Sequence, residues 1–291
     1  MAATYSKEEV YKLVRERIGR RVRSGELNVP VLPHIAQEIL ALTNSPNSSA
    51  RDFVALIEKD QQLSSRLLKI ANSPVYAGLV AVTSIQTAVV TVGMNTLRDL
   101  VFGVAMGERI FRSKMFGDLV RQMWEHSLTV AYIAKEIATL KRVDAEYAFL
   151  CGLMHDVGKP LVLETLEEIV KRTEGKLRPE AELVNGLLQD YHAAVGGLMA
   201  RAWNFPATLH DVIRYHHEYD EAGPAQRMAL ITYTANQFAH AMGFGSYMDE
   251  EPMEIAGDHA LTALNLSDEK VDELLERLPK ATRELITSFS G

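Results

Sequence analysis

The chain has 291 residues, of which 47% are hydrophobic and 24% are charged, and its formal net charge is −7. This composition is typical of a folded globular protein and excludes wholesale disorder. The length allows one large domain or two that share an interface. The acidic balance disfavours a strong nucleic-acid binder, which is usually basic over at least one domain.

The cysteine count and the distribution of apolar residues limit where in the cell the protein is expected to be. Cys151 is the single cysteine, so neither an internal disulfide framework nor a cysteine-rich zinc site can form. The first ten residues, MAATYSKEEV, show no basic cluster followed by an apolar run, which a signal peptide needs. The most apolar stretch, Leu100–Gly107, is shorter than the roughly 20 residues that cross a bilayer. We expect a cytoplasmic protein without a membrane partner.

Apolar residues repeat at helical spacings of three, four and seven along almost the whole chain. In chain order the apolar stripes run through Val10, Val14 and Ile18; Leu32, Ile35, Ile39 and Leu42; Phe53, Leu56 and Ile57; Leu63, Leu67 and Ile70; and Leu119, Met123, Val130, Ile133 and Ile137. Ser49, Ser84 and Asp144 are candidate helix caps. The β-branched run Val89–Val92 is ambiguous, but its flanks favour helix. The predicted fold class is all-α.

We predict three parts along the chain: an N-terminal helix (1–28), one domain (29–240) and a C-terminal helical extension (241–291), where the sequence changes character. A seam at Gly117 divides the domain into an N-terminal helical lobe (29–116) and a histidine-bearing lobe (117–240). The extension begins with Gly243-Phe244-Gly245-Ser246 and the acidic run Asp249–Glu251, and it then resembles a set of short amphipathic helices.

The histidine-bearing lobe holds a set of imidazoles and one carboxylate, groups that ligate zinc, iron, manganese or nickel. The set consists of His126, the adjacent pair His155 and Asp156, His192, and the adjacent pair His216 and His217. His126 lies on the inward side of its predicted helix. His155 and Asp156 follow an apolar helix, 148–154, which Gly158 and Pro160 are expected to end.

The adjacent pairs restrict how an ion could be shared. Neighbouring helical residues point about 100° apart. His155 and Asp156 can therefore share one ion only over the edge between them, or each can address one ion of a close pair; the same holds for His216 and His217. Burying the Asp156 carboxylate in an apolar setting is costly without a cation.

The ordinary interpretation of a buried histidine is a hydrogen-bonded core residue, and we assign His34, His210, His240 and His259 to ordinary structural roles. His126 or His192 alone would carry no more weight, and the run 216–218 alone could be a solvated helix end. Within 152–159, however, an apolar helix, a His-Asp pair and a Gly-Lys stop occur together. This combination favours metal ligation by the whole set.

The order His, His-Asp, His, His-His on helices resembles the HD superfamily of metal-dependent phosphohydrolases. The first half resembles one branch of it, the HDOD (HD-related output domain) proteins. The matching segments are Val29–Pro33, Arg66–Tyr76, parts of Ser84–Val101, Trp124–Ser127, Ala148–Lys159 and Trp203–Pro206, so that the resemblance covers roughly Val29 to Phe238. It implies an all-α HD-superfamily bundle with an N-terminal helical lobe, a bacterial signalling context and one or two divalent transition-metal ions (Fe, Mn, Ni or Zn).

The chain departs from both kinds of relative. Many HDOD proteins have lost part of the metal site and act as non-enzymatic output modules, whereas this chain keeps all six residues. Active HD enzymes usually close the site with an aspartate, where this chain has Asn236. An asparagine adds a neutral oxygen and no charge, so one tightly held ion is favoured over two unless Glu125 or Glu218 turns inward.

The related HD-GYP cyclic-dinucleotide phosphodiesterases place a Gly-Tyr-Pro signature after His-His-Glu. Here the chain reads His216-His217-Glu218-Tyr219-Asp220-Glu221-Ala222-Gly223-Pro224, without that tripeptide. Some of these enzymes also hold a third ion with a glutamate one turn before the first histidine, where this chain has Gln122. Hydrolysis of cyclic di-GMP is therefore not favoured.

Two functions remain open. The first is a signal-transduction output module with a metal-occupied site that binds a signalling protein or a nucleotide-type ligand; residues 72–82 are a candidate contact surface, although ordinary packing explains them too. The second is a phosphohydrolase acting on a nucleotide or cyclic dinucleotide through a metal-activated water. Asp156 and Lys159 would then be catalytic, with Lys159 neutralising phosphate charge and Arg201 and Arg214 assisting. Lys159 has an ordinary interpretation too, as a cation near a helix C-terminus.

Overall fold

The computed structural model describes residues 7–45, 48–76, 81–172, 178–245 and 254–289, and these residues form helices and no strand. The predicted all-α fold class is confirmed. The first helices are α1 (Lys7–Ser24), α2 (His34–Asn44), α3 (Ala50–Glu58), α4 (Gln61–Ala71), α5 (Ile85–Val92) and α6 (Met94–Arg109). They are followed by α7 (Gly117–Leu140), α8 (Ala145–Met154), α9 (Gly158–Arg172), α10 (Ala181–Ala202), α11 (Ala207–Tyr215), the short η1 (Tyr219–Glu221) and η2 (Gly223–Ala225), α12 (Gln226–Ala241), α13 (His259–Ala263) and α14 (Asp268–Phe289).

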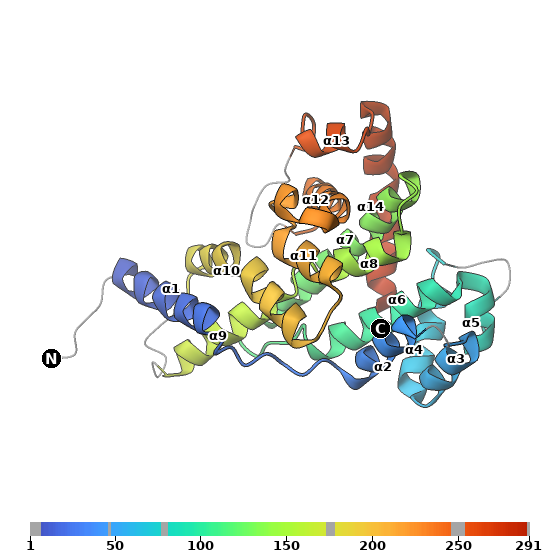
Figure 1. Ribbon diagram of the computed structural model, residues 1–291, viewed down its shortest axis with the longest axis horizontal. Helices are drawn as coiled ribbons and strands as arrows, with labels where there is room; N and C mark the ends of the chain where they lie inside the picture. Colours follow the sequence, from blue (N-terminus) through green and yellow to red (C-terminus); the bar gives the residue numbers. More distant parts are fainter. Residues whose placement is uncertain (1–6, 46–47, 77–80, 173–177, 246–253, 290–291) are drawn as a thin grey trace.

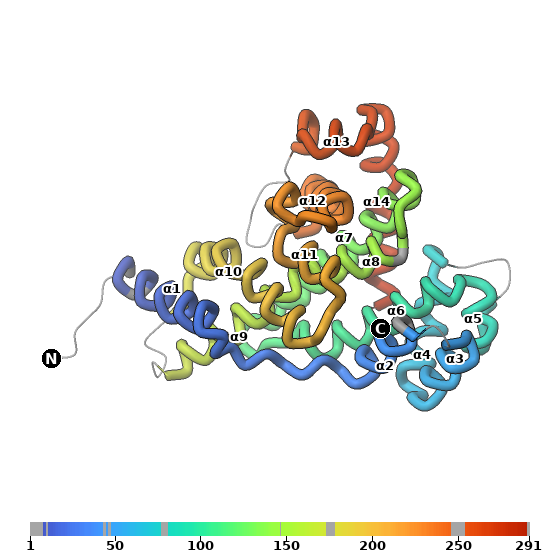
Figure 2. Tube along the Cα trace, viewed as in Figure 1, coloured from blue at the N-terminus to red at the C-terminus, as the bar shows by residue number. Residues whose placement is uncertain are grey.

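The helices form an elongated body (Figure 1). Helices α2 to α6 gather at one end, α7 to α12 occupy the middle, and α1 lies at the opposite end against α9 and α10. Between α1 and α2 the chain runs in an extended segment along the body (Figure 2). Trp203 holds this segment by donating a hydrogen bond from its indole N–H to the Pro30 carbonyl at 2.8 Å. The predicted boundaries at 28/29 and 240/241 stay predictions.

Helix starts follow local signals in the sequence. Ser49, Ser84 and Asp144 each accept a backbone N–H bond in the first turn of α3, α5 and α8, which confirms the three predicted caps. At Ser49 the Asp52 carboxylate also accepts the Ser49 N–H at 2.9 Å, and this completes a capping box. The ambiguous run Val89–Val92 is helical, as part of α5.

One predicted helix end is wrong. Gly158 and Pro160 do not end the helix that precedes His155, because α8 ends at Met154 and Gly158 opens α9. Pro160 is compatible with this start, since the first four N–H groups of a helix have no acceptor within the helix. His155 and Asp156 therefore lie in a tight turn between two helices.

The C-terminal extension also differs from its prediction. Besides the short α13 it contains one long helix, α14, which spans 22 residues and includes Pro279. The acidic run 249–251 and Ser246 lie outside the described residues. Helix α14 packs along α7 and reaches the N-terminal lobe (Figure 1).

The end of α14 connects α4 and α6 with α7. The Arg66 guanidinium of α4 donates a hydrogen bond to the Phe289 carbonyl at 3.0 Å. The Phe289 ring lies 6.1 Å from the ring of Trp124 on α7, edge to face. It also covers Gly103 on α6, where a Cβ atom would be 3.1 Å from the Phe289 ring. Helix α7 is thereby fixed to the N-terminal lobe through α14.

Glycines let α8 and α9 approach their neighbours closely. A Cβ atom at Gly152 would lie 2.7 Å from the Val130 carbonyl oxygen and the Ala131 Cα atom of α7. A Cβ atom at Gly158 would overlap the His192 carbonyl oxygen and lie 2.6 Å from the Gly196 nitrogen of α10. These two contacts bring the His155–Asp156 turn between α7 and α10.

Of the candidate contact surface 72–82, residues 77–80 lie outside the described residues. The described part is tied together locally: the Asn72 side chain accepts the Val82 N–H and donates to the Val82 carbonyl, both at 2.8 Å. Tyr76 packs against the hydrophobic core, and burial raises the pKa of its phenol. These contacts are those of ordinary packing.

No single helix within the described segments is both long and apolar enough to cross a membrane. Helices α5 and α6 reach that length and composition only as a pair, and the pair is bent by 117°. Most of α6 is buried in the protein core.

The close contact between Gly158 of α9 and the α10 backbone predicts that a larger side chain is not tolerated there. We expect Gly158→Ala to lower the free energy of unfolding by about 1–3 kcal/mol, because the added methyl group must push α9 away from the α10 backbone. Urea unfolding followed by circular dichroism measures this loss. Gly117→Ala is the matched control, since a Cβ atom there meets nothing within 4 Å; equal stability of the two variants would contradict the packing argument.

Candidate metal centre

The structure places all six predicted site residues around one point. His126 comes from the middle of α7, His192 from α10, His155 and Asp156 from the turn after α8, and His216 and His217 from the end of α11. Five of them are buried with 4% exposure or less, whereas His217 is exposed. The site therefore reaches solvent on the side of His217.

The first three residues form one compact group. The Nε2 atoms of His126 and His155 are 3.3 Å apart, and they lie 3.5 Å and 3.1 Å from Asp156 Oδ2. The three donor atoms come from α7 and from the turn that Gly152 and Gly158 bring beside it. Together they form the first donor group: His126, His155 and Asp156.

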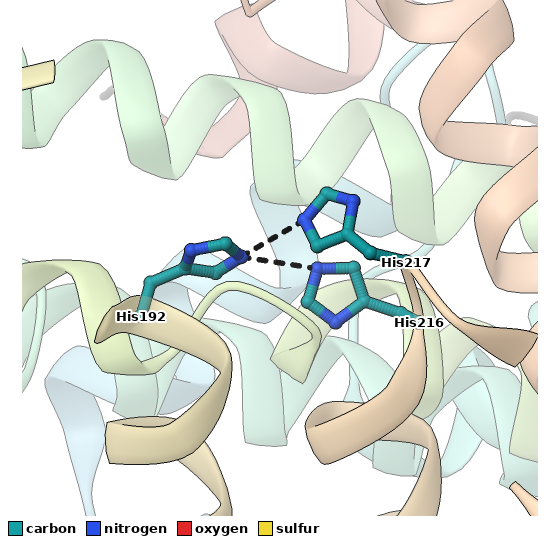
Figure 3. Close-up of side chains that lie close together, drawn as sticks. All are labelled: His192, His216 and His217. Carbon is teal, nitrogen blue, oxygen red and sulfur yellow. Dashed lines mark hydrogen bonds between the residues drawn. The ribbon is translucent and has the colours of Figure 1, made fainter. Parts of the chain in front are cut away.

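His192, His216 and His217 form a second donor group (Figure 3). The rings of His216 and His217 turn toward His192 from the neighbouring chain segment. The Nε2 atom of His192 lies 3.3 Å from that of His216 and 3.0 Å from that of His217. Adjacent residues thus address one group together, by meeting over the edge between them.

Asp156 lies between the two donor groups. Its Oδ2 atom faces the first group, while its Oδ1 atom lies 3.4 Å from His192 Nε2 and 3.8 Å from His216 Nε2. Besides the imidazoles, the Lys159 ammonium lies 2.5 Å from Oδ2. Each oxygen of this carboxylate is therefore directed toward imidazole nitrogens of a different group.

Backbone carbonyls fix which nitrogen of four rings carries the proton. A carbonyl can only accept, so each Nδ1 atom bonded to one must be protonated. The Nδ1 atoms of His126, His155, His192 and His216 donate to the carbonyls of Phe244, Gly152, Leu188 and Ile213 at 3.0, 2.7, 2.6 and 3.0 Å. In the neutral rings the Nε2 atoms therefore present lone pairs to the centre, as in metal-bound histidines.

Burial keeps several of these rings neutral. It lowers the pKa of His126 and His216 well below the ordinary value and that of His192 to about 3. Burial acts to raise the pKa of Asp156, but the neighbouring His155 ring and Lys159 ammonium outweigh it and hold the pKa well below its usual range. An ionised carboxylate thus faces the neutral imidazoles of His126, His192 and His216 at the centre.

Lone pairs that face one another at 3.3 Å repel unless a cation lies between them. Ligands bound about 2.0–2.2 Å from a zinc ion lie roughly 3.0–3.5 Å from one another. The three separations in the first group and the distances from His192 to His216 and His217 fall in this range. The residues present therefore fit one or two divalent transition-metal ions. The first group would hold one ion, and the second group with Asp156 Oδ1 would hold the other.

Asn236 is buried on α12, which packs against α7 and α8. Its Oδ1 atom has no hydrogen-bond partner in the described part of the chain. A buried carbonyl oxygen without a partner is costly, and a cation would satisfy it. Its place in the donor set stays a prediction.

The charged side chains near the site are already paired. Lys159 lies 2.5 Å from Asp156 Oδ2, so it faces the centre rather than only capping a helix end. Glu125 instead pairs with Arg121 at 2.9 Å, and Glu218 is exposed. Among the described residues, Asp156 is the carboxylate that contacts the rings.

Neither predicted assisting arginine is connected to Asp156 by a described ion pair. Arg201 donates to His210 at 2.9 Å, and His210 also bonds Asp211 at 2.8 Å. Arg214 lies 5.0 Å from the Tyr215 ring. These contacts give His210 an ordinary structural role, as expected from the sequence.

His240 is the residue that the sequence interpretation missed. Its ring centre lies 5.2 Å from that of His126, which equals the separation of the His126 and His155 rings. It follows Asn236 by one helical turn on α12, and this i, i+4 spacing was the available signal. Phe244 and Gly245, which also touch His126, come from a loop 118 residues away and gave no local signal.

The described residues form a helical bundle in which six histidine and aspartate side chains converge. The family model for the HDOD domain matches residues 29–219. The chain therefore belongs to the HDOD family.

The chain is also similar to curated proteins. An uncharacterised protein from Treponema pallidum is 29% identical over 214 residues, which cover 72% of this chain and 41% of that protein. The chain spans less than half of the length of the curated relatives it matches.

Two solved structures share the fold. One, from Shewanella amazonensis, is provisionally named as a metal-dependent phosphohydrolase; it has a TM-score of 0.74 and 19% identity, and it covers 96% of this chain and 99% of its own. The other, from Marinobacter aquaeolei, is provisionally named as a signal transduction protein; it has a TM-score of 0.71 and 21% identity, and it covers 97% of this chain and 66% of its own.

We expect Asp156→Asn to lower the bound zinc or manganese per chain at least about tenfold, because the shared carboxylate supplies the negative charge in both donor groups. Elemental analysis after metal loading and gel filtration measures the content, and circular dichroism checks the fold. Glu125→Gln is the control, since Glu125 pairs outward with Arg121. Unchanged metal content in Asp156→Asn would rule out a carboxylate-bridged site.

Proposed function

We propose that this chain is a bacterial signal-transduction output module whose HD-type site holds one or two divalent metal ions and binds a phosphate-containing, nucleotide-type ligand. The observation that supports this most is the convergence of lone pairs from His126, His155, His192 and His216 on the Asp156 carboxylate. The HDOD family match supports the output-module part.

The charge of the donor set favours an anionic ligand. Five imidazoles contribute no charge when neutral, and Asp156 contributes one negative charge. A single divalent ion would therefore leave the centre positive, and Lys159 adds a further positive charge 2.5 Å from Asp156. A positive, largely buried centre that opens at the exposed His217 attracts phosphate groups.

Hydrolysis of a phosphate ester is the second candidate, because the donor atoms divide into two groups that share Asp156. When bound there, divalent ions would stabilise charge on phosphoryl oxygens and activate a water molecule. Lys159 would orient the substrate phosphate. The neutral Asn236 leaves Asp156 as the contacting carboxylate, and this limits the charge available to hold a second ion; we therefore rank the output module first.

The two candidates separate when binding and turnover are measured on the same metal-loaded sample. We expect calorimetry to show binding of a nucleoside diphosphate that disappears after chelation, without phosphate release above background. If the wild-type protein releases phosphate and Asp156→Asn abolishes this release, the hydrolase becomes the supported function in place of the output module. Absence of both binding and turnover in metal-loaded protein would contradict the proposed ligand class.

A further inference from the structure

His240 lies beside the candidate metal centre but belongs to neither donor group. The donor atoms within each group all lie within 4.8 Å of one another, and no such group includes a His240 nitrogen. Its ring is tilted by 50° against His126, at 5.2 Å between centres. The side chain is half-buried, and no hydrogen bond ties it to another described residue.

The charged groups that act on His240 are those of the site. Burial lowers its pKa to about 4, and the Lys159 ammonium is the next largest cause, ahead of Asp156. The rings of His155 and His217 act on it as well. The ring contact with His126 places His240 beside the first donor group.

The loop after α12 holds this ring in place. Gly245 has a φ of +119° and lies against both rings: a Cβ atom there would be 2.5 Å from His126 Nδ1 and 3.2 Å from His240 Cε1. The Phe244 carbonyl accepts the His126 N–H from the same loop. Glycine is thus needed both for the backbone conformation and for the space beside the two histidines.

We propose that His240 is a ligand-binding residue that donates its ring N–H to a phosphoryl oxygen of the ligand bound at the adjacent metal centre. This inference rests on the proposed function and names a further contact within it. A neutral imidazole always has one N–H donor, and a half-buried donor without a protein partner is available to an acceptor from outside. Phosphoryl oxygens are strong acceptors, and Lys159 supplies the accompanying positive charge.

The test uses inorganic phosphate as the probe and the metal-loaded full chain. We expect His240→Ala to weaken phosphate binding about tenfold, which is the loss typical of a hydrogen bond to a charged group. His240→Gln keeps an N–H donor of similar reach and is expected to retain most of the affinity. Bound metal per chain is expected to stay at the wild-type value in both variants, and circular dichroism checks the fold. His259→Ala, at an exposed histidine of α13, is the matched control.

Unchanged phosphate affinity in His240→Ala with metal retained would overturn the inference. Loss of metal in both His240 variants would also overturn it, since His240 would then be a metal ligand. The inference is also contradicted if the wild-type protein takes up metal but does not bind phosphate. Wild-type protein that takes up no metal contradicts the proposed metal-holding function instead, so the two failures are distinguishable.

Discussion

The arrangement of the centre depends on one interaction: the electrostatic repulsion between imidazole lone pairs that face one another inside the helical bundle. Four rings donate their Nδ1–H groups to backbone carbonyls and so direct unprotonated Nε2 atoms at one another. Protonation would relieve the repulsion, but burial disfavours the charged form of His126, His192 and His216. A bound cation between the rings would relieve it, and Asp156 is placed so that each donor group could contribute to holding one.

This repulsion exists because small residues allow the backbones to come close. Gly152 packs on α7 and Gly158 on α10, so the turn between them inserts Asp156 between His126 and His192. Side chains of ordinary size at either glycine would separate the helices and spread the donors apart. Gly158, which the sequence predicted as a helix end, is therefore a contact point between helices.

Much of the arrangement could be predicted from the sequence because its signals are local or periodic. Helical stripes gave the fold class, and the caps at Ser49, Ser84 and Asp144 needed only the residues of one turn. The His-Asp pair in its apolar context, with three further histidine positions in order, predicted which residues would meet.

What the sequence could not predict depends on distant segments. The Phe244 carbonyl reaches His126 across 118 positions, and nothing near either residue indicates that contact. His240 was given an ordinary role because a lone histidine near a helix end carries no signal by itself. The start of α9 at Gly158 was misjudged because glycine and proline interrupt a helix in one position and are tolerated in the first turn of the next.

Helix α7 carries a donor of the centre and also contacts the end of α14. Trp124, which meets the Phe289 ring, precedes His126 by two residues, and Phe289 is held in turn by Arg66 of the N-terminal lobe. Helix α7, which Phe289 contacts at Trp124, also carries His126 of the first donor group. Through Phe289, α4 and α6 are thus in contact with the helix that carries His126.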